Sequence, residues 1–385
     1  MRATAFFFLF LAVGLSAPSA SAEPSWNDLF PAFEIRGTLG LSAGADSNPD
    51  EVPEPEASGF GRLDGEIHVE IGEGDGFRAF ADAEGAAQTY TDGSLGEEYR
   101  YEVDIELRQP LGETLEFSLG AERAEDTTDD PPTTSHDVWG QMAVETAIVL
   151  VELRGTIRDY REDMPRAEIV ADDLEVFDER AYSVRLRSQL NIGAPIRPMA
   201  EARVSAVDYL ERRPGKPARD AIEYSLAAGV AVDINDGLAV QLGLRRNERF
   251  FEAEDAGSHS NFGPDLEVEW SPNDRVHVLV WMYRGFAEPS FEDGLIRDLS
   301  VAGIEWSYDA TDRLRFDGGL GAADEEEVGT DYHKLELDGY AEGRFALRDG
   351  VDLLLGAYFD HEIRYDDPGD GFTRVAARAG LEASF

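Results

Sequence analysis

The sequence FTRVAARAGLEASF, from Phe372 to Phe385, alternates in hydrophobicity at nearly every step. One set of alternate positions is apolar: Val375, Ala377, Ala379, Leu381, Ala383 and Phe385. The positions between them are polar or small, with charges at Arg374, Arg378 and Glu382. A period of two is that of a β-strand, and here one face suits an apolar medium while the other tolerates charge. We therefore expect an amphipathic strand at Phe372–Phe385, and more strands of this kind in the rest of the chain.

The same alternation recurs along the chain. It is found at Ile35–Ala45, Gly61–Ile71, Phe77–Gly85, Tyr99–Leu107, Leu115–Ala121, Val138–Thr146, Val149–Ile157, Tyr182–Ile192, Met199–Tyr209, Ile222–Val232, Leu238–Leu244, Leu266–Trp270, Val276–Met282, Ala302–Tyr308, Leu314–Ala322, Leu335–Leu347 and Val351–Phe359. These stretches are close to the length of about nine to eleven residues that a tilted strand needs to cross a bilayer. The sequence therefore predicts an all-β fold, a closed antiparallel transmembrane β-barrel of about eighteen strands.

The connections between these stretches alternate in length. The short ones carry turn residues, as in Gly72–Gly76, Asn235–Gly237, Ser271–Asp274 and Arg348–Gly350. Transmembrane barrels combine short periplasmic turns with long extracellular loops, so we expect both termini on the periplasmic side and an even number of strands. An open sheet would leave unpaired backbone groups in hydrocarbon, which costs several kcal/mol per group. The first strand, at Ile35–Ala45, should therefore pair with the last.

The N-terminus is typical of an exported protein. Met1 and Arg2 precede the apolar run Phe6–Leu15, and Ala20-Ser21-Ala22 has the small-residue pattern of a cleavage site. We expect residues 1–22 to be a cleaved signal peptide, residues 23–33 a periplasmic N-terminal segment, and residues 34–385 the barrel.

Charge and composition exclude several functions. The net charge is −45, from 79 acidic and 34 basic residues, which argues against nucleic acid as a partner. The chain has no Cys, and its six His have no metal-ligand spacing, so we expect no metal and no cofactor. The acidic loops, such as Asp50–Glu56 and Asp172–Glu179, are expected to be solvated. The motif at Gly40–Gly44 matches G-x-S-x-G but lies within a predicted strand, so we expect no enzyme.

The inward positions of the alternation carry the functional content. We predict that the following residues line the pore: Arg62, Asp64, Glu66, Arg100, Glu102, Asp104, Arg154, Arg185, Arg187, Arg203, Arg245, Glu267, Glu269, Arg315, Asp317, Glu336, Asp338, Arg344, Arg374 and Arg378. Arginine and carboxylate are expected to interleave on neighbouring strands. Because acid outnumbers base over the whole inward face, the pattern predicts a porin-like channel for small hydrophilic solutes or ions that is weakly cation-selective. The longest loop, Arg161–Glu179, is the expected constriction.

Aromatic residues are expected at both membrane interfaces. The final strand resembles the C-terminal signature of bacterial outer-membrane barrels, in which a terminal aromatic residue is recognised by the barrel assembly machinery. The resemblance implies that Phe385 is an assembly signal. It also implies a cell outer-membrane location, with membrane lipids and lipopolysaccharide as partners.

A second resemblance lies at Leu41–Pro49, LSAGADSNP, followed by an acidic loop and then by FGRLDGEIHVEI. This arrangement is similar to the beta-barrel porin 2 family, in which an Asp-Ser or Asp-Asn turn ends the first strand. The matching residues here are Asp46, Ser47 and Asn48. The family implies an outer-membrane barrel, linked in places to exopolysaccharide loci.

Two other functions stay open. An exopolysaccharide exporter would resemble the alginate-export family in its number of strands and would have an arginine-dominated constriction. A structural or adhesin barrel would have a plugged lumen. The oligomeric state is not determined by the sequence.

Overall fold

The computed structural model describes residues 33–48, 57–72, 76–91, 97–127, 132–162, 178–191, 195–210, 220–235, 237–253, 257–287, 295–366 and 371–385. The predicted signal peptide and nearly all of the predicted periplasmic segment lie outside these ranges. Within them the chain forms strands β1 (Phe33–Asp46), β2 (Ser58–Ile71), β3 (Arg78–Tyr90), β4 (Glu97–Pro110), β5 (Leu115–Asp126), β6 (Thr133–Glu145), β7 (Val149–Glu162), β8 (Glu179–Leu190), β9 (Ile196–Tyr209), β10 (Ala221–Asn235), β11 (Leu238–Phe251), β12 (Ser258–Asn273), β13 (Val276–Ala287), β14 (Ile296–Thr311), β15 (Leu314–Val328), β16 (His333–Arg348), β17 (Val351–Arg364) and β18 (Thr373–Ser384). None of the described residues belongs to a helix that is long and apolar enough to span a membrane.

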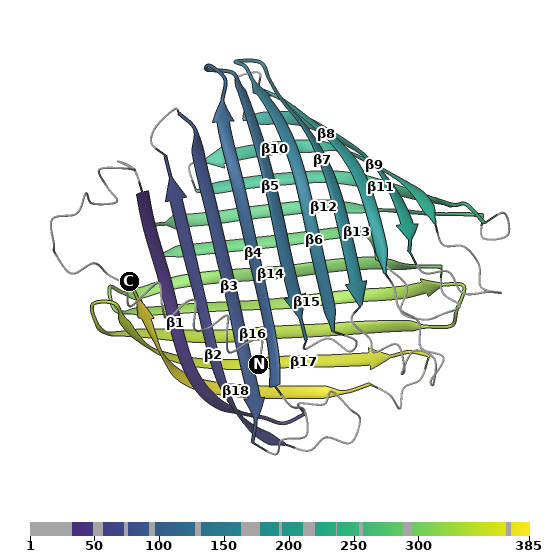
Figure 1. Cartoon of the computed structure of the whole chain (residues 1–385). Helices are drawn as coiled ribbons and strands as arrows, with labels where there is room; N and C mark the ends of the chain where they lie inside the picture. The colour runs from purple at the N-terminus through teal and green to yellow at the C-terminus, as the bar shows by residue number, and fades with distance from the viewer. Residues whose placement is uncertain are drawn as a thin grey trace.

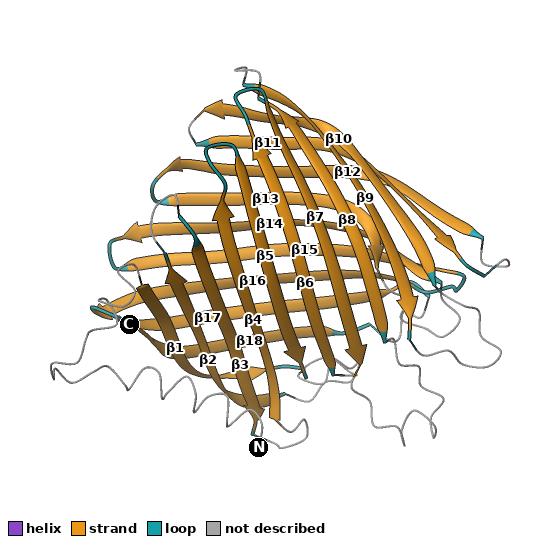
Figure 2. Ribbon diagram, turned by 45° about the horizontal axis from the view of Figure 1, so that its top comes forward, coloured by secondary structure: helices purple, strands orange, loops and turns teal. Residues whose placement is uncertain are grey.

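These strands form a single closed sheet. Each strand pairs antiparallel with its neighbour in sequence, and β1 also pairs with β18, from Thr38 opposite Ser384 to Asp46 opposite Ala376. In Figure 1, and from another side in Figure 2, β10–β17 cross behind β3–β9 at a large angle, as strongly tilted strands do on opposite walls of a barrel. The predicted fold class, the eighteen strands and the pairing of the first strand with the last are confirmed.

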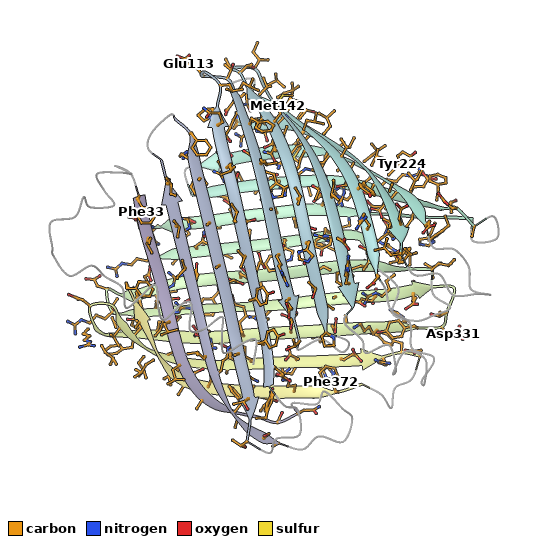
Figure 3. All side chains as sticks on the ribbon, in the orientation of Figure 1. Phe33, Glu113, Met142, Tyr224, Asp331 and Phe372 are labelled. Carbon is orange, nitrogen blue, oxygen red and sulfur yellow. The ribbon has the colours of Figure 1, made fainter. Side chains whose placement is uncertain are left out.

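The two ends of the barrel differ in their connections. One end, which we call the short-turn end, holds the tight turns and the ends of the strands at Phe33 and Phe385. The other, the long-loop end, holds the connections such as those between β7 and β8 and between β9 and β10. Figure 3 shows Glu113 at the short-turn end and Asp331 at the long-loop end.

Local chemistry explains the tight turns. Asn235 accepts a hydrogen bond from the backbone N–H of Gly237 through its Oδ1 atom at 2.9 Å. Asn273 does the same for Arg275, also at 2.9 Å. Gly350 has a φ of 71°, which only glycine adopts without strain in the turn between β16 and β17. These are the turn residues from which hairpins were predicted.

Apolar side chains cover the outer wall. Leu41 is 66% exposed and Leu320 is 64% exposed, although both lie in the middle of long strands. Met142 and Tyr224 are likewise exposed on the barrel wall (Figure 3). A sheet that turns this face outward has to place its charged alternate positions inside the barrel.

The buried residues gather near the long-loop end. Three small apolar clusters occur there, centred on Phe60 with Tyr90, on Val207 with Tyr209, and on Ile296 with neighbours that include Phe251 and Phe286. Ile296 has no exposed surface. Interior side chains therefore pack closely at the long-loop end.

Candidate functional site in the barrel lumen

Contacts that pass over whole strands identify the inner face of the sheet. Arg187 on β8 donates to Gln241 on β11 at 2.9 Å, across β9 and β10. Arg245 on β11 pairs with Glu201 on β9 at 2.9 Å, across β10. Side chains converge in this way only on the concave side of a curved sheet. Residues of the same alternation therefore face the lumen.

Every predicted pore-lining position lies on this face, by contact or by register. Arg62, Asp64, Glu66, Arg100, Glu102, Arg344 and Arg378 line one hollow of about 410 Å³. Arg154, Arg185 and Arg203 line a second hollow of about 370 Å³. Ion pairs and hydrogen bonds place seven more of the predicted residues on the inner face: Arg187, Arg245, Glu267, Arg315, Asp317, Glu336 and Arg374. The strand register places the remaining three there: Asp104, Glu269 and Asp338. That these residues line a conducting pore stays a prediction.

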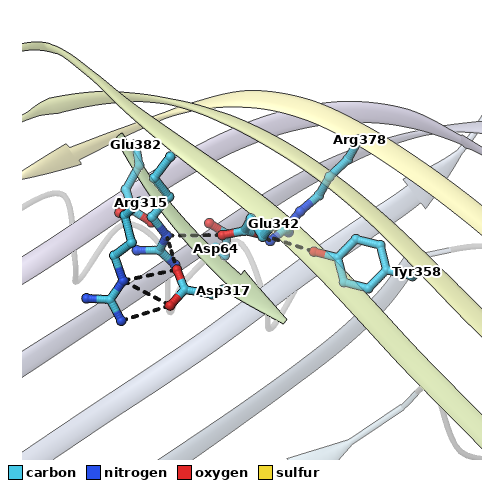
Figure 4. A network of polar contacts seen from close by, with 8 residues as sticks. Asp64, Arg315, Asp317, Glu342, Tyr358, Arg378 and Glu382 are labelled. Atoms are coloured by element: carbon cyan, nitrogen blue, oxygen red, sulfur yellow. Dashed lines mark hydrogen bonds and ion pairs between the residues drawn. The ribbon is translucent and has the colours of Figure 1, made fainter. Parts of the chain in front are cut away.

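A dense ionic network spans the junction of the last and first strands (Figure 4). Arg378 on β18 contacts Glu342 on β16 at 2.7 Å and Asp64 on β2 at 3.3 Å, so it links strands on both sides of its own. Glu342 also accepts from Arg344 at 3.1 Å and from the Tyr358 hydroxyl at 3.3 Å. The network continues through Glu382, Arg315 and Asp317. Here arginine and carboxylate interleave as the sequence predicted.

Interleaving fails in several rows on β2–β9, which is a correction to the prediction. Glu66, Glu84 and Glu102 stand directly opposite one another on β2, β3 and β4. A parallel row runs through Asp82, Asp104 and Glu122. Alternation determines the face of each residue but not the register between strands, so the sequence could not show which charges would be neighbours. No three His, Asp or Glu side chains in the described ranges are placed to hold a metal ion.

Farther round the sheet, the like charges are positive. Arg154 on β7 stands opposite Arg185 on β8, which in turn stands opposite Arg203 on β9. The lumen therefore has an acidic sector on β2–β5 and an arginine-rich sector on β7–β9. The sequence did not predict this segregation, because alternation does not determine the register between strands.

The Asp46-Ser47-Asn48 motif joins β1 to β18 at the long-loop end. The Ser47 hydroxyl accepts from the backbone N–H of Val375 at 2.8 Å, and the Ser47 N–H donates to the Val375 carbonyl at 3.0 Å. The Asn48 side chain donates to the carbonyl of Thr373 at 3.3 Å. The motif thus extends the pairing of the two terminal strands beyond the end of β1.

Asp46 is the buried centre of this junction. It is 1% exposed and accepts from Arg374 of β18 at 2.8 Å and from the backbone N–H of Asn48 at 3.0 Å. Tyr90 of β3 lies beside both charged groups, and its hydroxyl accepts from Arg374 at 3.4 Å. The motif on which the family resemblance rested therefore has a structural role in closing the barrel.

At the short-turn end the junction is completed by Phe385. Its backbone N–H and carbonyl both bond to Gly37 at 3.0 Å. The ring lies over Gly37, where a Cβ atom would come within 2.6 Å of the ring carbon Cζ. The ring is 56% exposed on the same face as Leu381, which agrees with an aromatic position at the rim of the outer wall.

Other sequence predictions have different outcomes. The expected constriction at Arg161–Glu179 and the acidic loop at Asp50–Glu56 fall almost entirely outside the described residues. His361 faces Thr373, with 2.8 Å between Nδ1 and Oγ1, and the register pairs Asp360 with Arg374. Asp360 and His361 therefore have separate partners, because adjacent residues of a strand face opposite sides of the sheet.

No family model matches the chain, and no curated protein matches it. Among solved structures, it is similar to the siderophore receptor PirA from Pseudomonas aeruginosa, with 9% identity over 91% of this chain and 80% of that chain and a TM-score of 0.45. The FrpB iron transporter from Neisseria meningitidis (F5-1 variant) is 9% identical over 91% of this chain and 81% of that chain, with a TM-score of 0.48. The siderophore receptor PiuA from Acinetobacter baumannii is 10% identical over 91% of this chain and 82% of that chain, with a TM-score of 0.49.

These TM-scores are below 0.5, and the likeness carries no functional argument for this chain. Membership of the beta-barrel porin 2 family stays a prediction.

Proposed function

We propose that the chain is an integral barrel of the bacterial outer membrane that gives small hydrophilic solutes or ions a path across it. The observation that carries this proposal is the contrast between the two faces of one closed sheet. The outer face is apolar and exposed, whereas the inner face is lined with arginine and carboxylate groups.

The outer wall suits lipid and not water. Soluble proteins rarely expose contiguous apolar patches of more than a few hundred Å². Here exposed leucine, valine and isoleucine recur on strand after strand around the barrel, as at Leu41, Val184, Leu226, Leu320 and Leu381. Exposed aromatic side chains lie toward the strand ends, among them Phe77, Trp270, Tyr308 and Phe385 at the short-turn end and Tyr182, Tyr224 and Phe359 toward the long-loop end. This distribution supports a lipid-facing band between two aromatic girdles.

The lumen supports passage of polar solutes. A barrel with this many strands is wide enough to hold more than packed side chains. The acidic sector, with Glu66, Glu84, Glu102 and Asp104, would concentrate cations in the lumen. We place the short-turn end in the periplasm, with lipopolysaccharide and lipid as the surroundings and the barrel assembly machinery as the partner during insertion. The proposal includes no catalysis.

A second candidate is a barrel with a closed lumen. It is favoured by the packing at the long-loop end, where Ile296, Asp46 and Glu327 have almost no exposed surface. The third possibility, export of an anionic polysaccharide, draws support from the arginine-rich sector on β7–β9. Conductance separates these alternatives.

The first prediction concerns ion flow through the purified protein. In planar bilayers we expect discrete conductance steps, and in a salt gradient we expect a reversal potential with the sign of modest cation preference, because unneutralised carboxylates face the lumen. Replacing Glu84 and Glu102 together by Gln should reduce that preference. The absence of steps would favour the closed barrel, and clear anion preference would favour export of an anionic polymer.

A further inference from the structure

Two rows of side chains lie next to each other on the lumenal face of β7, β8 and β9. The first, the arginine row, consists of Arg154, Arg185 and Arg203. The second, the hydroxyl row, is two residues away on each strand and consists of Thr156, Ser183 and Ser205. Arg203 donates to Ser205 at 3.1 Å, which connects the two rows. Three guanidinium groups and three hydroxyls thus share one small area of the wall.

The arginine row is unfavourable for the empty barrel. Like charges directly opposite on paired strands destabilise a sheet. Within the described chain, none of the three arginines has a carboxylate in ion-pair contact, and the positions that extend the row, Gln141 and Ser225, are neutral. Carboxylates act on this row only from beyond ion-pair distance, as Asp137 does on Arg154 and Glu223 on Arg203.

The adjacent row on the same strands differs, because acidic and basic residues alternate along it. On the other side of the arginine row, Arg187 stands between Glu152 and Glu201. Opposite charges alternate there in the register, and Glu201 forms its ion pair with Arg245 of β11 at 2.9 Å. The same three strands thus carry one balanced row and one row with three positive charges.

The arginine row and the hydroxyl row both line the hollow of about 370 Å³. Arg158 and Arg249 add two more guanidinium groups, and three carboxylates, Asp137, Glu179 and Glu223, also line the hollow. Asp137 is already engaged by Arg158, with contacts of 2.8 and 2.9 Å. Five arginines against three carboxylates leave an excess of two positive charges.

We propose that this hollow is a binding site for the phosphate or carboxylate group of a small anionic solute. Guanidinium groups bind such oxyanions bidentately, and hydroxyls donate to the remaining oxygens. Pockets for small molecules have volumes of about 300–1,000 Å³. The hollow lies at the lower end of this range, which suits a solute no larger than a sugar. The site goes beyond the proposed channel function, because binding does not require that the lumen conducts.

The structure supplies a reporter for this site. The guanidinium carbon of Arg154 lies 4.2 Å from the centre of the Trp139 ring, on a tryptophan that is only 9% exposed. An anion that binds Arg154 changes the charge above this ring. Binding should therefore alter the fluorescence of Trp139, and a Trp139→Phe variant should lose the response.

The experiment is a titration of the full barrel in detergent micelles with inorganic phosphate, at ionic strength held constant by sodium chloride. A parallel titration with acetate distinguishes phosphate from carboxylate. We expect a saturable change in tryptophan fluorescence that chloride alone does not give. No saturable response to either anion, by fluorescence and by calorimetry, overturns the proposal.

The decisive variant is Arg185→Gln, at the centre of the row. We expect it to raise the Kd for the anion at least tenfold while leaving the thermal unfolding temperature unchanged or higher, because it also removes the repulsion. Arg197→Gln is the matched control on β9, where Arg197 pairs with Asp233 at 2.6 Å outside the hollow. The Kd of the Arg197→Gln variant for the anion should stay within twofold of that of the unchanged protein. Equal losses in the two variants, or none in Arg185→Gln, would contradict a specific site.

Discussion

We expect the Asp46→Ala variant to lose about 3–5 kcal/mol of unfolding free energy, because it removes one partner of a buried ion pair. Asp46 has 1% of its surface exposed, and the side chain of Arg374 is 23% exposed. Without the carboxylate, Arg374 keeps its charge at a place where water has little access. Urea titration of the barrel refolded into lipid vesicles, followed by tryptophan fluorescence, measures the loss.

Two further variants separate the causes. Asp46→Asn keeps the side-chain acceptor for the N–H of Asn48 but loses the charge, so it should be nearly as unstable as the alanine variant if the ion pair dominates. Glu34→Ala breaks the pair of Glu34 with Arg36 at the other end of the same strand. Since both side chains are largely exposed there, little change is expected. Equal stability of the Asp46 and Glu34 variants would show that the buried pair does not hold the junction.

The strands and the closure of the barrel could be predicted from the sequence because both depend on local alternation. Leu63, Val69 and Ile71 had to share a face whatever their partners were, because side chains alternate between the two faces of a strand. Closure followed from the cost of a free strand edge in lipid. Neither step needed to know which residues stand opposite one another.

The lumen could be predicted only in its composition. Arg154, Arg185 and Arg203 were assigned to the inner face from the sequence, but their alignment in one row depends on the register of β7, β8 and β9. Register is determined by connection lengths and by the shear of the whole barrel, which one strand does not encode. The same holds for the packing around Ile296, whose neighbours come from strands far apart in the sequence.

The role of the Asp46-Ser47-Asn48 motif was also beyond the sequence. The family resemblance implied a turn after the first strand, and such residues are common in turns. Its partners, Thr373, Arg374 and Val375, come from the other end of the chain and are brought near only by closure. A short local motif thus has a long-range function in this fold.

Deletion of Phe385 should strongly reduce the amount of folded barrel in the outer membrane, while the same variant refolded into vesicles should lose only about 1–2 kcal/mol, near the worth of the two hydrogen bonds to Gly37. The difference arises because the exposed terminal ring contributes little to packing, so its main use would be as a signal to the assembly machinery. Fractionation of cells with heat-modifiability gels gives the first quantity, and urea titration gives the second. Phe385→Tyr, which keeps an aromatic ring, should restore assembly, whereas unchanged insertion of the deletion variant would rule out the signal.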